Sequence, residues 1–196
     1  MRIVTLATPP SKTEIEMIHR FVTYPSVIVH IRKPEISLSQ MAAFVSSFDP
    51  MERKQLVLHQ YQTYSHDWGI ERIHYSASQR SKADIGDNDS ILKISTSTHS
   101  WQEFNGLAAH YDAAFISPIY ASISKKNYNG NEVLLHTEQR SNFDTQLIAL
   151  GGVSPHNIGN LCARFDDFAV CGGLWLAPDP LREFNAYHTQ WHEQYG

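Results

Sequence analysis

Histidine is the residue type with the clearest capacity for chemistry in this chain. It occurs 11 times in 196 residues, and a neutral imidazole suits both proton transfer and metal coordination near neutral pH. Four histidines lie near the carboxyl ends of successive apolar runs: His30, His59, His74 and His99. Because no carboxylates cluster with them, we expect no metal site and favour proton transfer or substrate contact. A hydrogen-bonded structural role is the alternative for each ring.

Two glycine pairs have the composition of a phosphate site. Gly151 and Gly152 end one apolar run, and Gly172 and Gly173 end the next. Glycine has no Cβ, so its backbone N–H group can approach phosphate oxygens closely. We predict that these four residues bind a phosphate through their N–H groups. The alternative for either pair is a tight turn.

One loop and one strand offer further contacts to an anion. The stretch FISPIYASISKKNYNG supplies two hydroxyls and a cation, from Ser122, Ser124 and Lys125, although a single loop lysine often lies on a solvated surface. His30 and Arg32 are two residues apart, so in a strand both look into the interior or neither does. We predict a catalytic role for Lys125 and substrate contacts for the other four.

Composition limits the domain count and the partners. A chain of 196 residues, 42% hydrophobic and 18% charged, can build one well-buried domain, which we assign to residues 1–196. A net charge of -4 and a pI near 6.2 argue against a nucleic-acid or membrane surface. The two cysteines in apolar context read as reduced thiols, and the opening MRIVTLATPP is neither a signal peptide nor a membrane span. We therefore expect a cytoplasmic protein.

The elements that must position these residues alternate between strand and helix. Eight short apolar runs have strand composition: 2–8, 26–32, 55–60, 71–78, 91–100, 113–120, 146–152 and 168–175. Amphipathic segments of helical period lie between most of them and after the last: 12–24, 37–48, 100–111, 157–165 and 179–195. The predicted N-caps are Ser37 or Ser39, Ser100 and Asp179.

This alternation predicts a single (β/α)8 TIM barrel, in which the carboxyl ends of the strands carry the catalytic loops. An open doubly wound sheet has the same alternation, but its usual GxGxxG loop is absent, since LATPPSKTE follows the first strand. Barrel enzymes often hold a phosphate after strands seven and eight, where the two glycine pairs lie. The segments after 71–78 and after the Lys125 loop look too polar or too short for full helices.

Five motifs, in order along nearly the whole chain, resemble the thiamine phosphate synthase and TenI family of barrels. VIVHIRKPEIS is similar to the family's HIRER signature at His30 and Arg32. ISTSTHSWQEF is similar to GxSxHSxEEA at Ser97 and His99. AAFISPIYASISKKN resembles ADYIGFGPVFPTxTK, with Lys125 at the position of its lysine, and LIALGGVSPHNI and FAVCGGLW resemble the two phosphate-gripping strand ends.

The resemblance implies an enzyme of thiamine biosynthesis and a small-molecule partner. In synthase members, the loop from Ser122 to Lys125 would contact the pyrophosphate of an activated pyrimidine. The glycine ends of strands seven and eight would grip the phosphate of the thiazole. Ser97 is implied as a further substrate contact.

The departures from the family pattern concern magnesium. Synthase members bind the ion through an aspartate after strand three and another after strand four, where this chain has His59-Gln60 and Ser76 to Gln79. Neutral side chains replace carboxylates poorly as magnesium ligands. The strand-two lysine is also displaced, because Pro34 stands at its position and Lys33 should point the other way. Magnesium is therefore expected only if the synthase reaction occurs.

TenI-type members dispense with magnesium and tautomerise a thiazole carboxylate phosphate. Their active histidine lies in the SxHS motif and corresponds to His99 here. The missing aspartates favour this reaction over synthase chemistry, although synthase members carry the same histidine. A ligand-binding paralogue without turnover and an unrelated phosphate-handling barrel isomerase are the remaining hypotheses.

Overall fold

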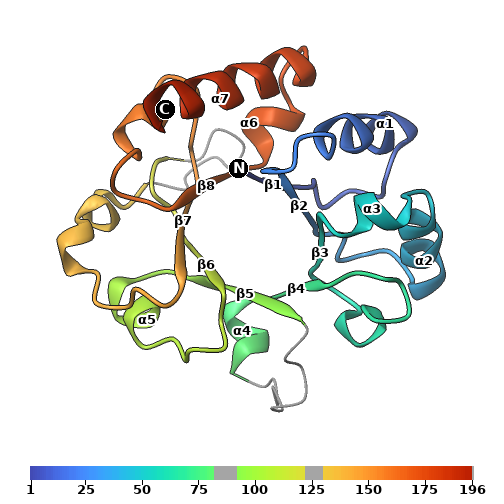
Figure 1. Cartoon of the computed structure of the whole chain (residues 1–196), viewed down its shortest axis with the longest axis horizontal. Coiled ribbons are helices and arrows are strands. Elements are labelled where there is room, and N and C mark those ends of the chain that lie inside the picture. The colour runs from blue at the N-terminus through green and yellow to red at the C-terminus, as the bar shows by residue number, and fades with distance from the viewer. Residues whose placement is uncertain (82–91, 122–129, 196) are drawn as a thin grey trace. The chain divides into compact units, whose positions relative to one another are not determined.

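The protein is described by a computed structural model that covers residues 1–81, 92–121 and 130–195. Eight strands form a closed barrel in chain order, from β1 to β8 (Figure 1). This confirms the predicted TIM barrel. The chain divides into two compact units, one of residues Arg2–Ser95 and one of Thr96–Gly196 together with Met1. The assignment of residues 1–196 to one domain stays a prediction.

The unit Arg2–Ser95 contains the first four strands and the beginning of the fifth. Its strands are β1 (Arg2–Val4), β2 (Ile28–Ile31), β3 (Leu56–Leu58), β4 (Arg72–Tyr75) and the start of β5 (Lys93–Thr98). Its helical elements are α1 (Lys12–Phe21), α2 (Leu38–Ser46), α3 (Pro50–Arg53), the 3-10 turn η1 (Gln62–Tyr64) and α4 (Ala77–Arg80). Every residue of β2 and β3 is buried, as in parallel strands covered on both faces. A polar residue in β2 therefore lies in the interior.

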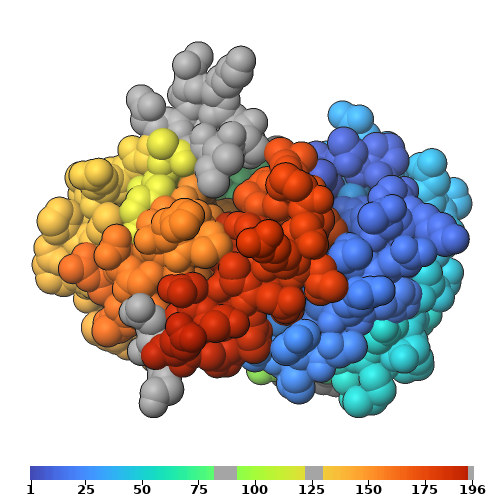
Figure 2. Space-filling model, turned by 90° about the horizontal axis from the view of Figure 1, so that it is seen from above, coloured from blue at the N-terminus to red at the C-terminus, as the bar shows by residue number. Residues whose placement is uncertain are grey.

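The unit Thr96–Gly196 contains the remaining strands, β6 (Ala113–Ile116), β7 (Gln146–Leu150) and β8 (Asp167–Val170), which pair in parallel. Its helical elements are α5 (Trp101–Asn105), α6 (Gly172–Trp175), α7 (Pro180–Tyr195) and the 3-10 turns η2 (Glu132–Leu135), η3 (Thr137–Gln139) and η4 (Ile158–Asn160). Helix α7 packs against α6 and η4, and its outer face forms part of the surface drawn in red in Figure 2. The buried Tyr187 hydroxyl donates to the Val153 carbonyl over 2.9 Å and ties the loop after β7 to this helix.

Side-chain caps fix where three of the helices begin. Ser37, and not Ser39, caps α2 and forms a reciprocal capping box with Gln40. Ser100 caps α5 by accepting a backbone N–H three residues later. Asp179 accepts the N–H groups of the first turn of α7. The capping residues expected from the sequence are confirmed in all three places.

Several predicted helices are shorter than their amphipathic patterns. Helix α5 covers only Trp101–Asn105 of the predicted 100–111 and stops at Gly106, a poor helix former. The predicted helix 157–165 is only the turn η4, because Ala163 has a left-handed φ of 64°. The last predicted strand ends early, and its second half begins α6.

The segments expected to be irregular contain short turns of helix. After β4, Ser76 and Gln79 form a capping box for the one-turn α4. The residues that follow, 82–91, lie outside the described part. The predicted substrate contacts Ser122 and Ser124 and the predicted catalytic residue Lys125 fall in 122–129 and also lie outside the described residues. No helix in the described part is long and apolar enough to cross a bilayer.

Candidate active site

His99 lies directly after β5, and a backbone carbonyl fixes which of its ring nitrogens is basic. Its Nδ1 is 2.9 Å from the carbonyl oxygen of Ser117, which follows β6. A carbonyl only accepts hydrogen bonds, so Nδ1 carries the hydrogen and the neutral ring has its lone pair on Nε2. His99 is solvent-exposed. The geometry therefore gives His99 one defined basic atom at the carboxyl end of a strand.

The backbone around His99 is held from two directions. The His99 N–H donates to Glu103 Oε2 over 3.3 Å, and Glu103 belongs to the helix that Ser100 caps. The Ser117 N–H donates to the Thr98 carbonyl over 3.1 Å, which joins the ends of β5 and β6. Ser97, the predicted substrate contact, is half-buried on β5 two residues before His99. These contacts limit the freedom of the imidazole before any ligand binds.

Gly151 and Gly152 are required by a close approach of two backbone segments. Both have positive φ, of 103° and 63°. A Cβ at Gly151 would lie 3.0 Å from Pro118 Cα, and one at Gly152 would overlap the Ala121 carbonyl oxygen. The Tyr120 N–H donates to the Gly151 carbonyl over 3.0 Å. The tight-turn alternative thus accounts for this pair, and the phosphate contact through its N–H groups stays a prediction.

Gly172 and Gly173 begin α6, and only Cys171 separates them from the end of β8 at Val170. Gly172 is buried and Gly173 half-buried. The first N–H groups of a helix have no acceptor within the helix. An anion at this end of β8 could therefore meet backbone donors, as the predicted phosphate site requires.

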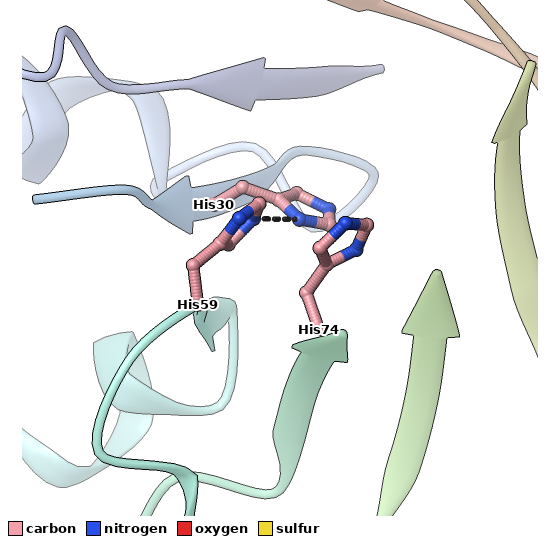
Figure 3. A group of neighbouring side chains, drawn as sticks. All are labelled: His30, His59 and His74. Carbon is pink, nitrogen blue, oxygen red and sulfur yellow. Dashed lines mark hydrogen bonds between the residues drawn. The ribbon is translucent and has the colours of Figure 1, made fainter. Parts of the chain in front are cut away.

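Three of the four predicted histidines come together in the unit Arg2–Ser95, from neighbouring strands (Figure 3). His30 belongs to β2, His59 follows β3, and His74 belongs to β4. Their side chains are almost fully buried. His30 Nδ1 is 3.0 Å from His59 Nε2, and the rings of His59 and His74 stack with centroids 4.1 Å apart. The sequence singled out each residue but did not place them in one cluster.

Burial keeps these three imidazoles uncharged. Desolvation lowers the pKa of His74 to about 3 and the pKa values of His30 and His59 well below the usual 6.5, with smaller contributions from neighbouring positive charges. His74 Nδ1 is 3.0 Å from Ser95 Oγ, whose hydroxyl donates to the Ile73 carbonyl. Because that hydroxyl has a single hydrogen, His74 must donate from Nδ1 and carry its lone pair on Nε2.

Arg32 differs from the sequence expectation, and the neighbouring Lys33 forms a buried ion pair. β2 ends at Ile31, so the two-residue alternation does not extend to Arg32, which is exposed while His30 is buried. The expectation that these two share one environment was wrong. Lys33 is fully buried, and its Nζ contacts Glu14 Oε2 at 2.7 Å. It also donates to the carbonyls of Leu6 and Thr8. A substrate contact by Arg32 stays a prediction.

The resemblance to synthase members places magnesium ligands at Gln60 and Gln79. Both side chains instead make local hydrogen bonds. Gln60 Oε1 accepts the Lys33 N–H over 3.0 Å. Gln79 Oε1 accepts the Ser76 N–H over 2.9 Å, as part of the cap of α4. Neither place offers a carboxylate, the ligand that magnesium prefers. The side chains present in these two places therefore do not fit a magnesium–pyrophosphate site.

The fold and the residues at its strand ends define a (β/α)8 barrel with a candidate proton-transfer histidine after β5. The chain belongs to the thiamine monophosphate synthase family, an enzyme family whose model matches residues 2–174. This confirms the family expected from the motifs, whereas the TenI-like subtype stays a proposal.

Known structures share this fold at low sequence identity. A thiamine phosphate pyrophosphorylase from Bacteroides thetaiotaomicron is 23% identical, with a TM-score of 0.73 over 97% of this chain and 96% of its own. One from Pyrococcus furiosus is 13% identical, with a TM-score of 0.72 over 100% and 96%. A 3-keto-L-gulonate-6-phosphate decarboxylase from Vibrio cholerae is 12% identical, with a TM-score of 0.69 over 100% and 99%. No curated protein sequence gives a significant match.

Proposed function

We propose that this protein is an enzyme of thiamine biosynthesis that binds a thiazole phosphate and moves a proton on it with His99. The observation that carries the proposal is the hydrogen bond from His99 Nδ1 to the Ser117 carbonyl, at 2.9 Å. It leaves Nε2 as the base on an exposed ring, at a strand end where barrel enzymes carry their catalytic groups.

In the proposed tautomerisation, His99 Nε2 removes a proton from a carbon of the non-aromatic thiazole carboxylate phosphate. The electron pair of the broken C–H bond enters the ring system, and the imidazolium returns a proton to another substrate atom, so that the ring becomes aromatic. The Ser117 carbonyl accepts the Nδ1 hydrogen throughout and stabilises the charged ring. The glycine N–H groups, Lys125 and the loop hydroxyls are proposed to hold the phosphate.

The second candidate reaction is the joining of pyrimidine pyrophosphate to thiazole phosphate, with release of pyrophosphate. The family match supports it. Gln60 and Gln79 argue against it, because they stand in the magnesium positions without a carboxylate. A metal held by carboxylates stabilises the charge of a leaving pyrophosphate by several kcal/mol. We therefore expect weak or undetectable joining activity at ordinary magnesium concentrations.

The test compares both reactions in one preparation. Purified protein is incubated with the thiazole tautomer, or with pyrimidine pyrophosphate and thiazole phosphate, each with magnesium and with EDTA. We expect magnesium-independent loss of the ring C–H signal by NMR, reduced about 10²- to 10⁴-fold in His99→Ala. His110→Ala, which alters another exposed histidine of the same unit, should keep full activity. Brisk, magnesium-dependent formation of thiamine phosphate would reverse the ranking. Thiazole phosphate binding without either product would instead identify a ligand-binding paralogue.

A further inference from the structure

The histidine cluster in the interior of the unit Arg2–Ser95 has the composition of a transition-metal site. One nitrogen from each of His30, His59 and His74 lies within 4.8 Å of the others. All three side chains enter the same small volume from neighbouring elements (Figure 3). We propose that these three imidazoles bind one divalent transition-metal ion of the Zn²⁺ type. The proposal does not depend on the reaction assigned to His99.

The distances allow coordination with small movements of the rings. Zinc–nitrogen bonds of about 2.0–2.1 Å place two tetrahedral ligand atoms about 3.4 Å apart. His30 Nδ1 and His59 Nε2 are now 3.0 Å apart and would separate slightly. The widest pair, at no more than 4.8 Å, would close by at most about 1.4 Å. Rotation about the side-chain torsions can supply movements of this size.

Coordination changes which nitrogens carry hydrogen but not the charge of the rings. The hydrogen bond between His30 and His59 now places one hydrogen between two nitrogens. If both nitrogens are ligands, the donating ring must move its hydrogen to its other nitrogen, so two lone pairs face the ion. His74 already has its lone pair on Nε2, because Nδ1 donates to Ser95.

Hydrogen bonds around the cluster orient its histidines. Metal-binding histidines are commonly oriented by hydrogen bonds to neighbouring groups that do not bind the ion. Ser95 orients the ring of His74 over 3.0 Å. Gln62 Nε2 donates to the carbonyls of both His59 and His74, over 2.8 and 2.9 Å, and so fixes the spacing of the two backbones. The His59 N–H donates to the Ile31 carbonyl of β2 over 3.2 Å. All three ligand-bearing segments are thus connected before an ion binds.

The ligand set selects the class of metal. Neutral imidazoles suit Zn²⁺, Co²⁺, Ni²⁺ and Cu²⁺, whereas Mg²⁺ and Ca²⁺ prefer oxygen. Three protein ligands leave a fourth position for water or another small ligand. The charges of Arg2 and Arg72 act on His30 and weaken its attraction for a dication, so we expect weaker binding than in a four-ligand structural zinc site.

Cobalt titration tests the site directly. Full-length protein is freed of metal with EDTA, which is then removed, and Co²⁺ is added while visible absorption is recorded. We expect saturation at one Co²⁺ per chain and displacement of the spectrum by Zn²⁺. His59→Gln and His74→Gln should each weaken Co²⁺ binding at least tenfold, with folding checked by circular dichroism. Absence of saturable binding to the folded wild type would refute the proposal.

A matched control distinguishes Co²⁺ binding at the cluster from Co²⁺ binding to histidines on the surface. His188 and His192 lie one turn apart on α7, with ring centroids 4.3 Å apart, and offer a competing two-histidine site. The double variant His188→Gln/His192→Gln should bind Co²⁺ as the wild type does. If the cluster variants fail to fold, X-ray absorption of the Zn²⁺-loaded wild type decides the question. Three imidazole ligands support the proposal, and two or fewer contradict it.

Discussion

At the residue scale, the glycines after β7 have a structural role that does not depend on the predicted phosphate contact. Gly152 has a left-handed φ of 63°, and the segment after β6 approaches it so closely that no Cβ fits. The glycine pair in the sequence predicted a phosphate contact. The close approach of two backbone segments requires a glycine here as well. A substitution must therefore be evaluated first for stability and only then for ligand affinity.

Gly152→Ala is expected to lower the free energy of unfolding by about 2 to 4 kcal/mol, because a left-handed alanine and an overlap with the Ala121 carbonyl oxygen both cost stability. Gly69→Ala is the matched control. Gly69 has φ 65°, and a Cβ at this residue would meet no atom within 4 Å, so we expect a loss of only about 1 kcal/mol. Urea denaturation measures both, and equal losses would contradict the steric argument.

At the element scale, the ends of the strands decide which polar residues meet. His30, His59 and His74 approach one another because β2, β3 and β4 are neighbours, with Val29 opposite Leu56 and Leu58 opposite Ile73. The sequence predicted the strands and the histidines at their ends. It did not predict the cluster, because a register between strands depends on packing. The expectation of no metal site rested on the lack of carboxylates beside the histidines, but imidazoles alone can ligate an ion.

Acid should destabilise the metal-free protein through this cluster. Below pH 6.5 the unfolded histidines gain protons, whereas folded His74 stays neutral down to a pKa of about 3. Its contribution to stability is therefore complete above pH 6.5 and is lost as the pH falls toward 3, at up to about 1.4 kcal/mol per pH unit. His30 and His59 act in the same direction.

Urea denaturation between pH 5 and 8 in EDTA measures this dependence. The comparison with His74→Gln isolates the histidine from carboxyl groups that titrate in both proteins. We expect the wild type to lose stability more steeply than the variant below pH 6.5 and the two slopes to agree above it. Parallel curves throughout would show that His74 is not held neutral in the folded state.

At the scale of the whole molecule, the alternation of short apolar runs with amphipathic segments was sufficient to predict the closed barrel. Helix lengths were less predictable, because Gly106 and the left-handed Ala163 interrupt amphipathic patterns that continue in the sequence. The tautomer of His99 could not be predicted either, since it depends on a carbonyl 18 residues away. The candidate site residues were therefore easier to predict than their hydrogen-bond partners.

Thermal unfolding tests the prediction of one domain. Each strand of a closed barrel has two hydrogen-bonded neighbours, so unfolding one part would leave unpaired strand edges in the rest. We expect a single calorimetric transition whose van't Hoff and calorimetric enthalpies agree. Two separable transitions, assigned to residues 2–95 and 96–196 by limited proteolysis, would contradict it.

The environment of Lys33 has a consequence for chemical labelling. Its ammonium group has no exposed surface and is surrounded by two carboxylate oxygens of Glu14 and the carbonyls of Leu6 and Thr8. An acylating reagent must reach the amine nitrogen, and the folded chain leaves no exposed surface at this residue. Modification of Lys33 must wait until β2 and α1 separate. The rate at which this amine is acylated therefore reports how often that part of the chain opens, whereas an exposed lysine such as Lys12 reacts without any opening.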